Sequence, residues 1–352
     1  SHTPGLNFFI SIGEFLPTPV IRGIAPTDMA GENNAGIYID GVYVSGRAGL
    51  NANQLDLERV EVNKGPQAAM YGRNAFSGAI NLVTAKPTKE FGLKAELQAG
   101  NDGIVVAKGS VTGPIVGDVL MGRLGVAYND WDGSYNNSYS RSDVGGYKFR
   151  TVQGSLLWEP TDSLSILGSA YYSDDKIDPN ATSTVMANCE NTNFANPALP
   201  PRLAEWCGKV PDLGTKDIPK IAQATGETRD LARLHLNIAW DTAVGTLTSV
   251  SAYINTEQDI GTDGSRNLAE SVPFVYCSNA AFPGAPLCSG VNPGIKRFTS
   301  GVLMDLPHGD KTKEFSQELR FSSKIGRLSY DVGAYYFDVD IDQAERGLVA
   351  TQ

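Results

Sequence analysis

Long hydrophobic runs are missing from this sequence of 352 residues. No stretch approaches the roughly 18 uninterrupted apolar residues that a membrane-spanning helix needs, and the mean hydropathy is −0.19. A helical inner-membrane protein is therefore excluded. An outer-membrane β-barrel is not excluded, because only alternate residues of its strands face lipid. Charged residues are scarce as well, at 19%, and the 38 glycines indicate strands and turns rather than helices.

Positive charge and histidine are also in short supply. The chain has 29 basic and 39 acidic side chains and a net charge of −10, which argues against a nucleic-acid partner. No glycine-rich phosphate loop follows a predicted strand, and His235, one of three histidines, lacks a Ser or Cys nucleophile motif. We therefore expect no catalytic residues, no cofactor and no metal site. Five loop aspartates do not fit the spacing of an EF-hand calcium loop, and solvated carboxylates are the simpler interpretation: Asp130, Asp132, Asp143, Asp259 and Asp263.

The four cysteines form two close pairs in long polar segments, Cys189 with Cys207 and Cys277 with Cys288. This spacing predicts two local disulfides and an oxidising compartment. A zinc site would instead show Cys-x2-Cys spacing or nearby histidines. Four reduced, unrelated thiols remain the alternative. The sequence starts at Ser1 without a signal peptide, so we expect the natural N-terminus to lie upstream.

From Phe91 onward, apolar and polar residues alternate in segments of strand length. Leu234 and Leu236, for example, alternate with His235 and Asn237. Nine strands are predicted in this region, near 91–100, 103–113, 119–130, 146–158, 163–174, 229–240, 245–258, 312–322 and 327–342.

The connections between these strands alternate between short and long after the first one. The long ones are 131–145, 175–228 and 259–311. This asymmetry is typical of an outer-membrane barrel, which has short periplasmic turns and long extracellular loops. Nine strands cannot close such a barrel, because closure needs an even number and an open edge cannot lie in lipid. We therefore expect the chain to stop part-way round the barrel.

The aromatic residues support the same interpretation. Trp158 and Trp240 end strands that run into short turns, whereas Tyr128, Tyr172 and Tyr336 lie at the opposite strand ends. Aromatic rings concentrate at the two membrane interfaces, so this placement predicts two girdles. A soluble core packed with aromatic rings explains the alternation of apolar and polar residues, but it does not explain the clustering of rings at strand ends.

The first 87 residues have a different pattern, in which short apolar pieces are broken by Gly and Pro. Three segments, 21–24 (IRGI), 37–44 (IYIDGVYV) and 57–87 (from LERVEVNKGP to INLVTAKP), closely resemble the plug domain of TonB-dependent outer-membrane receptors. The segment 312–321 (TKEFSQELRF) resembles the barrel of that family more weakly. The resemblance implies a transmembrane antiparallel β-barrel of roughly 22 strands, with a mixed α/β plug inside its lumen. We expect the plug, N-terminally incomplete, at 1–87 and the N-terminal part of the barrel at 88–352.

The resemblance also implies a function in the outer membrane of a Gram-negative bacterium. Receptors of this family bind a scarce nutrient from outside and import it with energy from the TonB system. Iron chelates, cobalamin, oligosaccharides and aromatic compounds all remain open as substrates, and outer-membrane lipid and lipopolysaccharide are expected neighbours. A non-transporting surface barrel that binds another protein is the main alternative, and a secreted soluble β-protein is a third. The TonB-contacting segment would lie upstream of Ser1.

Charged residues of the plug motif suggest how the plug is held. We expect an ionic latch in which Arg22, Arg59 or Lys64 pairs with Glu314 or Glu318 on the barrel wall, because buried charges need partners. Lumen charges solvated by trapped water are the alternative, and Lys64 stands where the family usually has Arg. Further motif positions, mostly structural, are Gly23, Asp40, Gly41, Glu58, Glu61, Gly65, Pro66, Tyr71, Gly72 and Asn81.

Two plug loops are expected to face the substrate. They follow short predicted strands on the side of the plug that would point outward. The residues proposed for this role are Asp28, Glu32, Asn33, Asn34 and Arg47.

Overall fold

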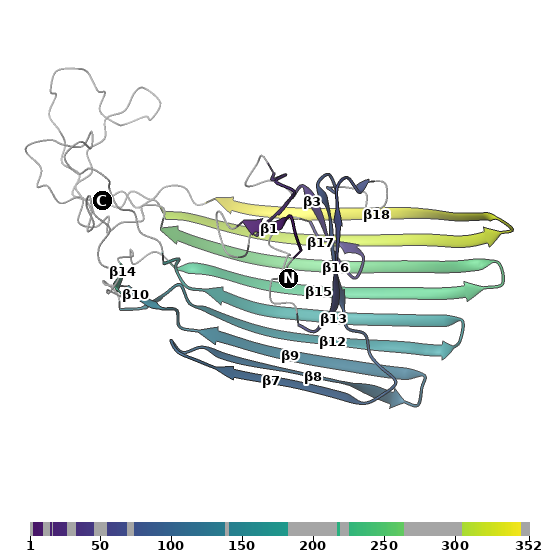
Figure 1. Cartoon of the computed structure of the whole chain (residues 1–352), viewed down its shortest axis with the longest axis horizontal. Helices are drawn as coiled ribbons and strands as arrows, with labels where there is room; N and C mark the ends of the chain where they lie inside the picture. Colours follow the sequence, from purple (N-terminus) through teal and green to yellow (C-terminus); the bar gives the residue numbers. More distant parts are fainter. Residues whose placement is uncertain are drawn as a thin grey trace, which may run out of the picture.

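The computed structural model describes residues 3–9, 15, 17–26, 33–45, 55–68, 74–137, 141–181, 217–218, 225–263 and 305–345. They form a large curved sheet, called the wall below, and a smaller body of short strands that lies against one of its faces, called the plug (Figure 1). In this described part of the chain, no helix has the length and apolar character that crossing a membrane would require.

The wall is a nine-stranded antiparallel sheet in which neighbours in sequence are neighbours in space. All nine predicted strands are confirmed. They are β7 (Gly92–Ala99), β8 (Val105–Val116), β9 (Leu120–Trp131), β12 (Tyr147–Thr161), β13 (Leu164–Ile177), β15 (Gly226–Thr242), β16 (Gly245–Asp263), β17 (Asp305–Ile325) and β18 (Leu328–Glu345).

The strands run further than predicted at the end that carries the long connections. The pairing of β16 with β17 continues to Asp263 opposite Asp305, beyond the predicted limits of 258 and 312. Two short strands, β10 (Tyr135–Asn137) and β11 (Asp143–Val144), fold from a segment predicted to be loop, and β10 also pairs with β14 (Asp217–Ile218). Backbone pairing continues there without apolar alternation, so the sequence pattern that located the strands has no signal for these extensions.

Each wall strand turns alternate side chains to opposite faces. The face that contacts the plug, called the inner face, is polar, as expected for a barrel lumen. The opposite or outer face is apolar over the middle of each strand and carries exposed leucines, valines and aromatic rings. Buried polar side chains of the inner face include Ser110, Asn129, Thr151, Ser155, Ser173, Arg233, His235, Thr256 and Ser316.

The two aromatic girdles predicted from the sequence are confirmed on the outer face. Trp158 and Trp240 are half-exposed close to the short turns. Tyr172 is half-exposed toward the opposite end of β13, Tyr128 lies at a corresponding position on β9, and Tyr336 is half-exposed near the middle of the long strand β18. The short turns gather at one end of the wall (Figure 1).

The plug contains two small sheets. In one, β1 (Leu6–Phe9) pairs with β2 (Thr18–Ile21). The other has the order β4-β3-β6-β5, with β3 (Ala35–Ile39) parallel to β6 (Gly78–Thr84) and antiparallel to β4 (Val42–Tyr43), while β5 (Leu57–Lys64) covers the far edge of β6. Of the helical part that the resemblance implied, the described plug residues contain Ala68, which is helical.

The plug core is small and tightly packed around Ile21, Ala35, Ile37 and Ile80. The boundary expected at residue 87 falls between the end of β6 and the start of β7, and it stays a prediction.

One glycine in this core has no substitute. Gly78 has a φ of +156°, and a Cβ atom there would lie 2.3 Å from the carbonyl oxygen of Asn63 and 2.7 Å from Ile21 Cδ1. Because real Cβ atoms do not approach backbone this closely, only glycine lets β5, β6 and β2 meet. Gly41 and Gly65 also have positive φ, at +81° and +102°.

Candidate functional site: the interface between plug and wall

Among the described residues, apolar contacts between plug and wall include two ring contacts and one larger cluster. Ring contacts join Tyr43 of the plug to Phe337 on β18, with centroids 6.0 Å apart, and Phe15 to Phe149 on β12, at 6.2 Å. The largest cluster joins one end of the central plug sheet to three wall strands. Its members are Ile39, Val44 and Leu82 of the plug with Tyr171, Leu231 and Ile254 of the wall.

One buried ion pair crosses the interface. Arg123 on β9 donates from Nε to Asp56 Oδ2 at 2.7 Å, and its terminal nitrogen also contacts that oxygen. The two side chains are only 9% and 15% exposed. Lys94 on β7 lies 3.7 Å from the other carboxylate oxygen of Asp56, but its side chain is largely in solvent. The pair with Arg123 is therefore the stronger electrostatic contact.

Two wall carboxylates bind the plug backbone. Glu227 on β15 accepts a hydrogen bond from the Phe15 amide at 3.2 Å, and Glu314 on β17 accepts one from the Ser45 amide at 3.0 Å. Both glutamates are 4% exposed. A charged acceptor makes such bonds stronger than neutral ones. Because the donors are backbone amides, these bonds specify the position of the plug chain rather than its side chains.

A guanidinium group of the wall also contacts Phe15. The Arg229 guanidinium lies 4.1 Å from the centre of the Phe15 ring, a cation–π contact. Arg229 also donates to Asp175 Oδ2 from Nε at 3.1 Å, and both side chains are fully buried. Phe15 is thus held by its amide, by its ring face and by apolar contact with Phe149.

Inside the plug, the motif residues form one hydrogen-bonded network. The Gly41 amide donates to Asn81 Oδ1 at 3.1 Å, Asn81 donates to Glu61 Oε2 at 2.9 Å, and Arg59 donates to Glu61 Oε1 at 2.7 Å. The hydrogen bonds from Asn81 and Arg59 lower the pKa of Glu61 below its ordinary value. The hydrogen bond to Glu61 raises the pKa of Arg59.

Asp40 ties the ends of two plug strands together. It has a positive φ of 52°, which places it in a tight turn between β3 and β4. Its carboxylate accepts the Thr84 amide and the Thr84 hydroxyl, both at 2.8 Å. These polar motif positions therefore join plug strands to one another.

Comparison with known proteins agrees with this architecture. Residues 1–79 match the TonB-dependent Receptor Plug Domain family. The chain combines a TonB-dependent receptor plug domain with part of the β-barrel fold of such receptors. It is 32% identical over 144 residues to a probable TonB-dependent siderophore receptor, PirA, of Acinetobacter baumannii, covering 36% of this chain and 19% of that protein. It is 28% identical over 123 residues to a vitamin B12 transporter, BtuB, of Photobacterium profundum, covering 35% and 20%.

A solved structure has the same fold over nearly the whole of the present chain. The ferric yersiniabactin uptake receptor FyuA from Yersinia pestis superposes with a TM-score of 0.67 at 18% identity, covering 98% of this chain and 46% of that one. The chain therefore spans less than half the length of the proteins that it matches. It is an outer-membrane protein of a Gram-negative bacterium, as the family is.

The partners predicted for the receptor's ionic latch are wrong for three of its five residues. Arg59 pairs with Glu58 and Glu61 within the plug, Lys64 donates to the Pro4 carbonyl oxygen at 2.7 Å, and Glu318 pairs with Arg320 on its own strand. Arg59 and Glu318 find oppositely charged neighbours within two residues, and Lys64 is satisfied by a backbone carbonyl oxygen of the plug. Of the other two residues, Arg22 lies in the turn after β2, and Glu314 does hold the plug, through the Ser45 amide.

Asp56 and Arg123 make the contact that the prediction assigned to other residues. The sequence does carry a signal for this contact. Arg123 is a charged residue on the inner face of a predicted wall strand, where a charge needs a partner. Glu314 was predicted to hold the plug, but its partner was not, and Glu227 was missed, because both glutamates bind backbone amides rather than side chains.

Several predicted positions are placed by the structure without a new contact to the wall. Gly23 has a positive φ of 77° in the turn that Arg22 begins, and Pro66 follows β5. Asn33 is 6% exposed, and the carbonyl oxygen of Asn34 accepts the Ser77 amide at 3.0 Å. The remaining predicted positions, including both disulfides, lie outside the described residues: Asp28, Glu32, Arg47, Tyr71, Gly72, Cys189, Cys207, Cys277 and Cys288.

Metal ligands were tested within the same limits. Across the described ranges, no group of three or more His, Cys, Asp or Glu side chains is arranged to hold a metal ion.

Proposed function

We propose that this receptor imports a scarce nutrient across the outer membrane, with release of the plug driven by the TonB system. The relatives support this proposal by their names, which are a siderophore receptor, a vitamin B12 transporter and a ferric yersiniabactin uptake receptor. Two of these three names refer to siderophores. A ferric chelate is therefore the first substrate class to test, and cobalamin the second.

The contacts that hold the plug support the proposal that it can move out of its place. The wall holds it through two carboxylates that bind backbone amides, one ion pair and three limited apolar contacts. Each polar contact is a discrete bond that water can replace once the plug shifts. An interface built as one continuous apolar core would not open in such steps.

We propose that the substrate binds between the outward plug loops and the long connections predicted at 175–228 and 259–311. Asp28, Glu32, Asn33, Asn34 and Arg47 are the plug residues assigned to this role. The acidic balance of the chain slightly disfavours a highly anionic ligand.

The test is uptake by whole cells carrying the natural, full-length receptor. Cells with and without the gene are given a radioactive ferric chelate under iron starvation, with and without an uncoupler that dissipates the proton gradient. We expect gene-dependent uptake that stops with the uncoupler while surface binding persists. Uptake that continues without the gradient would overturn energised import. Binding of another protein without any uptake, across ferric chelates and cobalamin, would favour the surface-barrel alternative.

A further inference from the structure

The outer face of the wall has a belt that matches the hydrocarbon layer of a membrane. Between the two aromatic girdles this face is mostly apolar. Above the upper girdle it becomes charged, with ion pairs between Lys148 and Asp130 at 3.1 Å and between Lys311 and Glu257 at 3.0 Å. The change from rings to paired charges marks where the outer face leaves hydrocarbon for headgroups and water.

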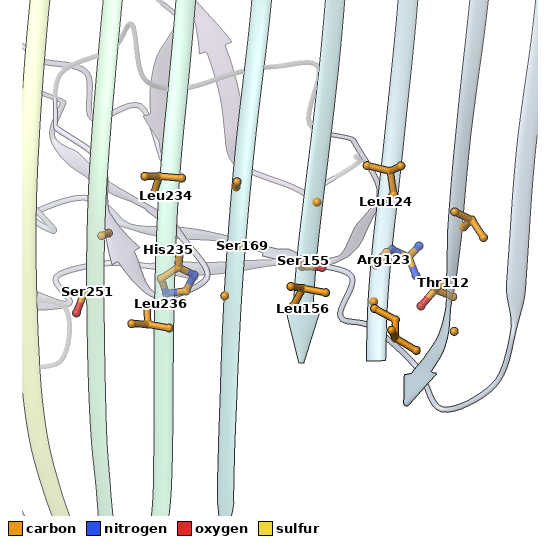
Figure 2. A pocket seen from close by; sticks show the side chains of 18 of the residues that line it. Thr112, Arg123, Leu124, Ser155, Leu156, Ser169, Leu234, His235, Leu236 and Ser251 are labelled. Atoms are coloured by element: carbon orange, nitrogen blue, oxygen red, sulfur yellow. The ribbon is translucent and has the colours of Figure 1, made fainter. Parts of the chain in front are cut away.

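Within this belt the outer face is hollowed into a groove of about 860 Å³. No plug residue lines it, so it opens away from the lumen. Leucines of three wall strands, β9, β12 and β15, stand along it (Figure 2): Leu124, Leu156, Leu234 and Leu236.

Small residues form the floor of the groove. Gly122, Gly154, Gly168 and Ala170 occupy outer-face positions where neighbouring strands carry leucine or tyrosine. A Cβ atom at Gly168 would meet no atom within 4 Å, and at Gly154 the nearest would be Leu124 Cδ1 at 3.9 Å. The protein's own side chains therefore leave this space open.

The groove crosses the belt obliquely. At one end, Gly113 and Ile115 lie next to the short turn between β8 and β9. At the other end it reaches the aromatic rings of Tyr253 and Phe315, which lie four residues below the ion pair between Glu257 and Lys311 on the same two strands. One end of the groove is therefore at the interface of the outer leaflet.

A polar cluster lies at that upper end, inside the belt. Ser251, which lines the groove, donates to Gln317 Oε1 at 2.5 Å, and Gln317 Nε2 donates to Ser249 Oγ at 3.0 Å and to the Glu318 carbonyl oxygen at 2.9 Å. Polar side chains that face lipid are costly and tend to be functional. The hydroxyl of Ser251 still has acceptor capacity for a group in the groove.

We propose that this groove holds one acyl chain of lipopolysaccharide, the outer-leaflet lipid, with a hydroxyl group of the chain donating a hydrogen bond to Ser251 Oγ. The groove is continuous with the lipid-facing belt, its lining is apolar, and its polar end lies at the depth where acyl chains join their headgroup. Lipid tails are as apolar as the lining, so binding comes from close packing in the open floor and from the hydrogen bond rather than from transfer out of water. This inference depends on the membrane placement of the wall and not on nutrient uptake.

The test measures lipopolysaccharide retained by the natural receptor after extraction and extensive washing in mild detergent. Hydroxylated acyl chains are counted per protein by chemical analysis, and the adduct is identified by native mass spectrometry. Gly168→Leu fills the groove without a clash, and Gly154→Leu is a second filling variant. Gly109→Leu is the matched control, because it adds the same side chain to the outer face of β8 outside the groove, where the nearest atom to its Cβ is 3.9 Å away.

We expect about one retained lipopolysaccharide in the unmodified receptor and in Gly109→Leu, and less than roughly a tenth of that in the two filling variants. Ser251→Ala should lower retention by about threefold to tenfold, the effect of one hydrogen bond in hydrocarbon. Equal retention in all variants would overturn the proposal. So would a phospholipid, a detergent molecule or a second copy of the chain as the adduct that the filling variants displace. Failure of uptake alone would leave this result unaffected.

Discussion

The ion pair between Asp56 and Arg123 provides the sharpest test of how the plug is held. In Asp56→Asn the guanidinium of Arg123 stays buried and loses its charged partner, keeping a neutral amide oxygen as an acceptor and a distant contact to Ser110 Oγ at 3.4 Å. One-sided loss of a buried pair costs about 3–5 kcal/mol. Arg123→Gln should cost less, because Asp56 keeps Lys94 as a second cation. The double variant leaves no uncompensated charge and should be less destabilised than Asp56→Asn alone.

Amide hydrogen exchange of β5, measured in the intact receptor, reports the opening of this region. A cost of about 3–5 kcal/mol corresponds to an increase of roughly 10²- to 10³-fold in exchange that proceeds by opening. The double variant should recover at least about tenfold of that increase, a coupling of more than about 1.4 kcal/mol. Two single effects that simply add would refute the argument, since the residues would then not act as a pair. Exchange in the wall strands far from the site serves as the internal control.

Three other predictions test separate contacts. Glu314→Leu removes the acceptor of a buried plug amide and should cost about 1–3 kcal/mol, seen as faster exchange of that amide, whereas Glu314→Gln keeps an acceptor oxygen and should cost less; equal effects would contradict this role. Gly78→Ala should leave little folded receptor in the membrane, because its methyl group meets backbone, whereas Gly23→Ala meets no atom within 4 Å and should cost only about 1–2 kcal/mol for its positive φ. Because the pKa of Glu61 is lowered in the folded plug, its contribution is present above the ordinary glutamate value of about 4.3 and is lost as the pH falls through the lower folded value. Exchange around Asn81 should therefore rise on acidification below about pH 4.3, and Glu61→Gln should flatten that dependence; a variant that keeps the same pH profile would show that another group is responsible.

The wall could be predicted from the sequence because lipid-facing and lumen-facing residues alternate along each strand. Each strand between the girdles must present apolar residues to lipid and polar residues to the lumen, so Leu234 and His235 already indicate opposite faces. The rings of Trp158 and Tyr172 gave the strand ends for the same reason. Beyond the girdles that requirement stops, and there the predicted limits of β16 and β17 were too short.

For the interface between plug and wall, the sequence predicted the type of contact but not most of the residues that make it. Charges in the plug motif implied ion pairs, but Arg59 found its partners within the plug, where Glu58 and Glu61 are close in sequence and cost little entropy to reach. Glu227 and Glu314 hold backbone amides. Nearly every residue has a backbone amide, so the sequence does not indicate which one a carboxylate will bind. Which carboxylate faces which amide depends on the depth at which the plug sits, and that is a property of the packed structure.

The polar contacts are also ordered along the chain in a way that matters for the proposed function. The plug groups that the wall holds are the Phe15 amide, the Ser45 amide and the Asp56 carboxylate, in that order from the N-terminal side. A pull applied upstream of the plug meets them one after another, so no step has to break more than one. Each amide contact is worth about 1–3 kcal/mol and the ion pair about 3–5 kcal/mol. Their sum keeps the plug seated at rest, while the largest single step, which limits release under load, is the last one, at Asp56.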